Sequence, residues 1–198
     1  LYITLYYPFY DLTAYGKNVL INSKSRNAWW LSKCFCAVSC VFTYFILMWA
    51  IIIIFCVCGA GKLTLNVSKS LIFKMIPMPS ENVFLSEGDF FSNRYLTCQM
   101  LLMPFLIVSA LSVMQMAVSL VIKPFFSFCI SAGILVLSAY YLNPLLLGNY
   151  AMSQRNDLLI DNGVNTKTGI VFSLALLVLS CVVGLFIFRR YDILNKED

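Results

Sequence analysis

The sequence predicts an all-α membrane protein, a polytopic bundle of transmembrane helices forming a single domain over residues 1–198. Its composition is 61% hydrophobic and only 12% charged, with a mean hydropathy of +0.84. The charged residues fall mainly between long apolar runs. A soluble domain of this size and composition would expose a large apolar surface, so the bilayer is the expected surrounding of most of the chain.

Four apolar runs without Lys, Arg, Asp or Glu are predicted to cross the membrane, which takes roughly 20 residues. They are residues 34–61, 95–122, 124–142 and 169–188. Only Lys123 separates the second run from Pro124, so these two spans are expected to form a tight antiparallel hairpin. Pro104 lies inside the second span, where it is expected to bend the helix and to need packing or water around the freed carbonyl.

The two remaining segments, residues 62–94 and 143–168, are predicted to be external loops. The second opens with Asn143-Pro144, which disfavours helix, and continues with an apolar stretch too short to span. That stretch is expected to lie at the interface or to re-enter the membrane. Arg155 and Asp157 follow it, either as the entrance of a pathway or as solvated residues that end a helix.

A basic and aromatic segment, Asn22 to Lys33, precedes the first span. It is typical either of a positive-inside flank with an aromatic belt or of a docking surface for a soluble partner. With this segment inside, basic residues number eight inside against six outside, and both termini are cytoplasmic. The inside set is Lys17, Lys24, Arg26, Lys33, Lys123, Arg189, Arg190 and Lys196; the outside set is Lys62, Lys69, Lys74, Arg94, Arg155 and Lys167.

The sequence offers little catalytic chemistry, and we expect no enzyme, no cofactor and no metal. The absence of His excludes Ser-His dyads and His-based metal motifs. Gly59-Ala-Gly-Lys62 departs from a phosphate-binding loop at Cys56 and Leu63. None of the eight cysteines forms a Cys-x-x-Cys pair, so they are interpreted as small apolar residues, with an external disulfide of Cys56 or Cys58 left open. Scattered basic residues do not suggest nucleic acid.

The order of these features resembles a known family. Ser25-Arg26-x-x-Trp29-Trp30-Leu-x-Lys33 enters a long span, and an external loop, the Lys-Pro hairpin, the Asn-Pro break and a last span ending in Arg189-Arg190 follow. From about Asn18 onward this order resembles the membrane subunits of bacterial ABC-type exporters of the type-2 permease superfamily, most closely the compact Firmicutes permeases beside peptide or bacteriocin genes. Such permeases have about six spans, so the chain is expected to begin inside a larger polypeptide.

The resemblance implies a permease in the cell membrane that couples to a separate ABC ATPase chain and pairs with a second permease subunit, identical or not. It places the coupling interface at Asn22, Ser23, Lys24, Ser25, Arg26, Trp29 and Trp30, with the two Trp side chains anchored at the headgroup level. It places a candidate external gate at Asn143, Pro144, Arg155 and Asp157. The implied substrate is a peptide or another amphiphile.

An alternative of a different class stays open, namely a bacteriocin-immunity or structural membrane protein that binds a partner and transports nothing. It would share the spans and the basic segment. The few charges within the spans argue against an ion-coupled carrier. An ion channel is disfavoured because no filter-like repeat is present.

Overall fold

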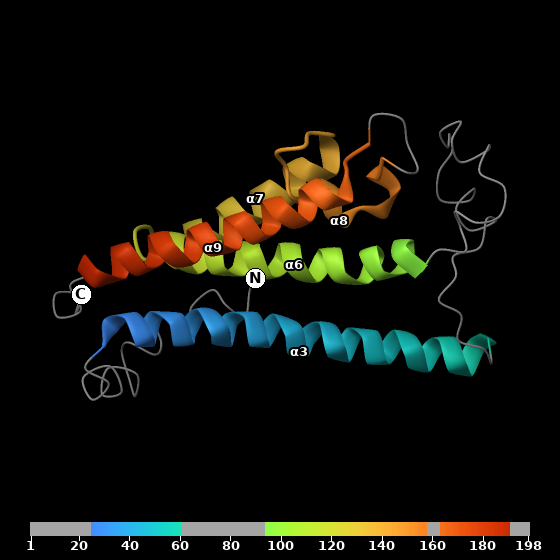
Figure 1. The fold of residues 1–198 in the computed structure, drawn as a ribbon, viewed down its shortest axis with the longest axis horizontal. Coiled ribbons are helices and arrows are strands. Elements are labelled where there is room, and N and C mark those ends of the chain that lie inside the picture. The colour runs from blue at the N-terminus through green and yellow to red at the C-terminus, as the bar shows by residue number, and fades with distance from the viewer. Residues whose placement is uncertain (1–24, 61–93, 158–162, 191–198) are drawn as a thin grey trace. The chain divides into compact units, whose positions relative to one another are not determined.

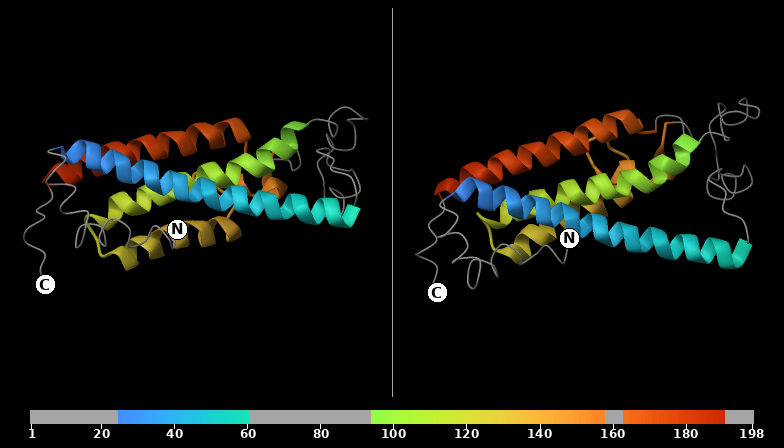
Figure 2. Two further views of the ribbon diagram at one scale, coloured as in Figure 1. Left: turned by 90° about the horizontal axis from the view of Figure 1, so that it is seen from below. Right: turned by 60° about the horizontal axis from the view of Figure 1, so that its bottom comes forward.

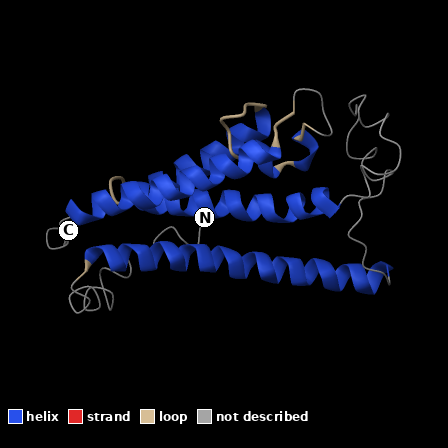
Figure 3. Ribbon diagram, viewed as in Figure 1, coloured by secondary structure: helices blue, strands red, loops and turns tan. Residues whose placement is uncertain are grey.

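The computed structural model describes residues 25–60, 94–157 and 163–190, which are almost entirely helical (Figures 1 and 3). Within these residues, β pairing is limited to an isolated bridge between Asn156 and Val164. The predicted all-α class is confirmed. The helices are α3 (Arg26–Ala60), α6 (Arg94–Ser119), α7 (Pro124–Tyr140), α8 (Gly148–Ala151), the 3-10 helix η1 (Ser153–Arg155) and α9 (Thr166–Arg190).

In the described residues, three helices are long and apolar enough to cross a membrane: Arg26–Gly59, Met100–Ser119 and Thr166–Arg190. The chain is therefore a membrane protein. The predicted third span, residues 124–142, is shorter than expected, because α7 has 17 residues and rises only about 26 Å against a hydrocarbon core of about 30 Å. The expected four full spans thus become three long helices and one shorter apolar helix. The predicted loop 62–94 lies outside the described residues except for Arg94.

Polar caps place two helix starts earlier than the charge-free runs predicted. α3 begins at Arg26 rather than Cys34, because the Ser25 hydroxyl accepts a hydrogen bond from the Ala28 N–H at 3.4 Å. α9 begins at Thr166 rather than Gly169, since the Asn165 side chain accepts from the Lys167 N–H at 2.9 Å. Lysines in a first or second turn do not end a helix, so the absence of charge was too strict a criterion.

The predicted tight hairpin between the second and third runs is confirmed. α6 ends at Ser119 and α7 starts at Pro124, a residue that suits the first helical position. Across the turn, the Ser127 hydroxyl donates to the Gln115 carbonyl oxygen at 2.6 Å. α6 continues as one helix through Pro104, whose missing N–H leaves the Met100 carbonyl without its usual intrahelical donor.

The chain divides into two compact units, described here separately. The first comprises Leu1–Val41, Val108–Gly133 and Leu174–Asp198, and the second comprises Phe42–Ile107 and Ile134–Ser173. The core of the first unit joins α3, α6 and α9 through Trp29, Trp30, Cys34, Ala37, Val113, Met116, Ala117, Leu120 and Phe188.

The second unit has an aromatic contact of its own and a polar cluster that is described below. Phe42 and Phe45 of α3 both contact the Phe105 ring of α6 edge-on, at 5.7 and 5.9 Å between ring centroids. Aromatic pairs at such separations add to the stabilisation from buried area.

Trp30 of α3 packs directly against Gly184 of α9 in the first unit. Trp30 is fully buried, and a Cβ added at Gly184 would lie 2.1 Å from Cζ2 of its indole ring. The indole Nε1–H donates to the Cys181 carbonyl oxygen at 3.0 Å. Glycine is therefore required here for close approach, since the indole occupies the space of a side chain on α9.

Replacing Gly184 with alanine is expected to destabilise the first unit by about 1–3 kcal/mol, because the methyl group cannot fit beside Trp30 without moving α9. Thermal unfolding of the purified protein in detergent measures this change. Gly133→Ala is the matched control, since a Cβ there meets nothing within 4 Å. That variant should be neutral or stabilised by up to about 1 kcal/mol through helix propensity. Equal unfolding temperatures for the two variants would contradict the contact.

Candidate functional site

The predicted coupling segment continues into a buried aromatic cluster formed by Trp29, Trp30 and Phe188, called the tryptophan cluster below. The Trp29 ring stacks on Phe188 at 4.8 Å with an interplanar angle of 10°, and Trp30 lies 5.9 Å from the same ring. Trp29 is 4% exposed and Trp30 is 0% exposed. The expectation that both tryptophans anchor at the headgroup level is therefore wrong: they join the start of α3 to the end of α9 inside the first unit.

The start of α3 and the end of α9 lie side by side (Figure 2), and polar contacts join them. Arg26 Nη1 donates to the Arg189 carbonyl oxygen at 2.9 Å, and Arg189 Nε donates to Asn27 Oδ1 at 2.8 Å. The last carbonyls of a helix lack intrahelical donors and carry partial negative charge, so a guanidinium is well placed there. The first turn of α3 and the last turn of α9 thus hold each other through reciprocal hydrogen bonds.

This end of the first unit is cationic. The described residues of the unit include five basic side chains and no acidic one; the basic residues are Arg26, Lys33, Lys123, Arg189 and Arg190. All but Lys33 are exposed, and Lys33 Nζ lies 5.1 Å from the centre of the Trp29 ring.

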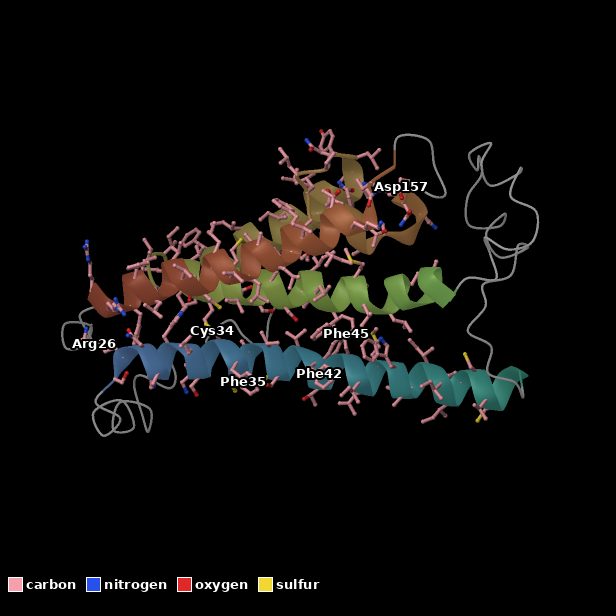
Figure 4. All side chains as sticks on the ribbon, viewed as in Figure 1. Arg26, Cys34, Phe35, Phe42, Phe45 and Asp157 are labelled. Carbon is pink, nitrogen blue, oxygen red and sulfur yellow. The ribbon has the colours of Figure 1, made fainter. Side chains whose placement is uncertain are left out.

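The predicted coupling residues are only partly described. Ser25 is exposed and caps α3, and Figure 4 labels Arg26 at the start of that helix. Asn22, Ser23 and Lys24 lie outside the described residues. The exposed part of the predicted interface is therefore Ser25 and Arg26, because the two tryptophans are turned into the core.

The candidate external gate is organised by Arg155 in the second unit. Its guanidinium donates to three main-chain carbonyls at the end of α7, those of Ser138 at 2.5 Å, Ala139 at 2.6 Å and Tyr141 at 3.3 Å. It also donates to Asn149 Oδ1. These carbonyls have no donor within the helix, so Arg155 supplies one from the following loop. Arg155 is thus a cap on α7 rather than a purely solvated residue.

Asn149 and Tyr150 bring the Asn143-Pro144 break into the same cluster. Asn149 is fully buried, and its Nδ2 donates to the carbonyl oxygens of Tyr141 at 3.0 Å and Asn143 at 2.8 Å. The Tyr150 hydroxyl donates to the Pro144 carbonyl oxygen at 2.8 Å. Burial raises the pKa of Tyr150, so this hydroxyl is protonated and able to donate at neutral pH. We call Arg155, Asn149, Tyr150 and their carbonyl acceptors the arginine cap.

Asp157, the fourth predicted gate residue, does not join the arginine cap. Its backbone N–H donates to the Val164 carbonyl oxygen at 3.2 Å, beside the isolated bridge (Figure 4). The partners of Arg155 in the described chain are all neutral oxygens. These hydrogen bonds of the Arg155 guanidinium are therefore with carbonyl dipoles rather than with a carboxylate, and these dipoles offset part of its charge.

The described residues contain no group of three or more His, Cys, Asp or Glu side chains able to hold a metal ion. The seven cysteines whose side chains are described are free thiols. Two of them, Cys34 of α3 and Cys181 of α9, pack in the core that holds the tryptophan cluster. The tryptophan cluster and the arginine cap, with the polar contacts around them, consist of cationic, aromatic and amide groups.

A family model described as "Protein of unknown function (DUF2705)" matches residues 7–194. The chain belongs to the DUF2705 family. No curated protein and no solved structure matches the chain. The DUF2705 match includes both the tryptophan cluster and the arginine cap, so both lie in the part of the chain that defines this family.

Sequence reasoning missed several residues that complete the two clusters of this DUF2705 protein. Cys181, Gly184 and Phe188 follow each other at spacings of three and four, which places them on one face of α9. Asn149 and Tyr150 interrupt an apolar stretch with polar groups that need partners when buried. The spacing on α9 and the polar residues in the apolar stretch could have pointed to these positions. Neither pattern identifies the residues that they contact.

Removing the guanidinium with Arg155→Ala is expected to cost roughly 3 kcal/mol, because several carbonyls at the end of α7 lose a charged donor. Hydrogen exchange of residues 138–152 should accelerate, and the thermal unfolding temperature in detergent should fall. Millimolar guanidinium ion should restore part of the protection, since it supplies the missing donors.

Gln154→Ala and Asp157→Asn are the matched controls, because Gln154 is exposed and the Asp157 side chain lies outside the arginine cap. Both variants should exchange like the unaltered protein. If Arg155→Ala also does so, Arg155 does not cap α7.

Proposed function

We propose that this protein is the membrane permease subunit of an ATP-driven ABC exporter, coupled to a separate ATPase chain. The observation that carries the proposal is the junction between the first turn of α3 and the last turn of α9. There Arg26 donates a hydrogen bond to the Arg189 carbonyl oxygen, and the Arg189 side chain donates one to Asn27 Oδ1. An ATPase chain that drives transport needs an attachment point that recognises its surface. That point must also be firmly packed against the membrane helices.

The charges support the chemical part of this proposal. Arg26, Arg189 and Arg190 are exposed at this end of the two helices, and such cations would favour a partner surface that carries carboxylates. Arginine suits this purpose, since its planar guanidinium pairs with both oxygens of a carboxylate. Nucleotide binding is assigned to the partner because Gly59-Ala-Gly-Lys62 lacks two required positions of a phosphate-binding loop.

The packing supports the mechanical part. Trp29 and Trp30 are buried against Phe188 directly behind the first turn of α3, and Gly184 leaves no free space beside Trp30. Tightly packed interiors have low compressibility and pass on small displacements. Movement of the α3 start by a docked ATPase would therefore reach α9 as well.

The remaining parts of the proposal follow the same assignment. The docking end and both ends of the chain lie on the cytoplasmic side of the cell membrane. A second permease subunit completes the pathway. The segment that includes Asn143, Pro144, Arg155 and Asp157 closes the pathway on the outside. Substrates are peptides or other amphiphiles, which suit a pathway bounded by apolar helices.

Purification of the tagged full-length protein from its source membranes in mild detergent tests the proposal. A co-purifying protein with the sequence G-x-x-x-x-G-K followed by Ser or Thr is expected. Arg26→Glu should reduce its recovery about tenfold, because a repulsive charge replaces an attractive one. Lys167→Glu is the matched control, since it reverses an exposed charge in the first turn of α9, 23 residues before its last residue Arg190 (190 − 167).

Thermal unfolding must show that Arg26→Glu remains folded, because Arg26 also caps α9. Trp29→Ala is unsuitable as a docking variant, since it would leave a cavity in the buried core. If no such ATPase is recovered with the unaltered protein, the exporter assignment is wrong. A non-transporting membrane protein that binds another kind of partner then becomes the better description.

A further inference from the structure

We infer that the ATPase docks on a composite surface formed by the last turn of α9 as well as by the first turn of α3. Arg189 and Arg190 belong to this surface together with Ser25, Arg26 and Ala28. The inference rests on the proposed function, and it assigns the partner a second contact that the coupling segment alone does not include. The partner surface is acidic and belongs to a soluble protein.

The hydrogen bonds place the two helix ends within one contact area. Arg26 Nη1 lies 2.9 Å from the Arg189 carbonyl oxygen, and Arg189 Nε lies 2.8 Å from Asn27 Oδ1. A specific protein interface covers about 800 Å² on each partner. One helical turn, which rises only about 5.4 Å, is much too small to provide that area alone. A protein seated on the first turn of α3 therefore extends over the adjoining last turn of α9.

The charges of α9 favour the same partner as those of α3. Arg189 and Arg190 occupy the last turn of α9, and both are exposed. Lys123, in the turn between α6 and α7, is a further exposed cation in this unit. An acidic partner would gain from each of these charges.

The arrangement of the side chains favours a protein over lipid headgroups. A helix end that serves as an interfacial anchor presents Trp or Tyr to the headgroup layer. Here Trp29 and Trp30 are 4% and 0% exposed, so the aromatic groups are withdrawn into the core. The hydrogen bonds of Arg26 and Arg189 also fix the guanidinium positions before binding, which reduces the entropy lost on forming a specific contact.

Site-specific photo-crosslinking tests the composite surface in the full-length protein within its source membranes. Benzoylphenylalanine is placed singly at three exposed positions: Ala28 in α3, Arg190 at the end of α9, and Lys167 at its start as the control. The expected result is a crosslink to the P-loop protein from positions 28 and 190 and none from position 167.

Each other result overturns the inference in a recognisable way. A crosslink from position 28 alone means that docking involves α3 only, while the proposed function stands. Crosslinks from position 190 to phospholipid alone identify a lipid contact. If the P-loop protein is crosslinked from none of the positions and does not co-purify, the proposed function and the inference fail together.

Charge reversal supplies a binding measurement that leaves the helix junction in place. Arg190→Glu keeps the hydrogen bonds between Arg26, Asn27 and Arg189, and it should weaken ATPase binding about fivefold at low salt, with a smaller effect at high salt. Lys167→Glu should bind as tightly as the unaltered protein. Unchanged binding of a folded Arg190→Glu variant at low salt excludes the α9 end from the docking surface.

Discussion

The need to satisfy every backbone polar group without water governs this structure. Lipid offers no hydrogen-bond partners, so membrane segments fold as helices and their ends need donors or acceptors from elsewhere. α7 makes this requirement visible, since it ends at Tyr140 and its terminal carbonyls accept from Arg155. The same requirement explains why buried Asn149 spans two further carbonyls. These bonds hold the segment after α7 against the end of that helix.

Packing of the helices in the first unit follows a second rule, that small residues permit close approach. Gly184 lets the Trp30 indole occupy the surface of α9, and Phe188 then covers both tryptophans. Interfaces between membrane helices depend on such contacts, because lipid removes most of the hydrophobic driving force between helices. The start of α3 is consequently part of the core, and only its polar positions face outward.

The sequence predicted those features that depend on local chemistry. Composition identified the membrane class, and the Lys123-Pro124 and Asn143-Pro144 steps located the hairpin and the break. A charge-free run places the start of this span after Lys33, whereas α3 already begins at Arg26 and the Lys33 ammonium lies over the Trp29 ring within the helix. Burial of the Trp pair could not be predicted, because it depends on a face of α9 more than 150 residues away in the chain. Arg155 was selected for its charge, but its carbonyl partners follow only from the folded loop.

The arginine cap and the α3–α9 junction have one arrangement in common. In both, a guanidinium from another part of the chain donates hydrogen bonds to carbonyl oxygens at the C-terminal end of a helix. Arg155 acts in this way on α7, and Arg26 acts on α9. Arginine is suited to both places, since its five N–H donors reach several carbonyls at once and its charge complements the helix dipole. Carbonyl dipoles cancel only part of a full charge, so each cap leaves a net positive field. At the α3–α9 junction Arg189 and Arg190 lie beside such a cap, and under the proposed function the same arrangement that ends α9 would attract an acidic partner protein.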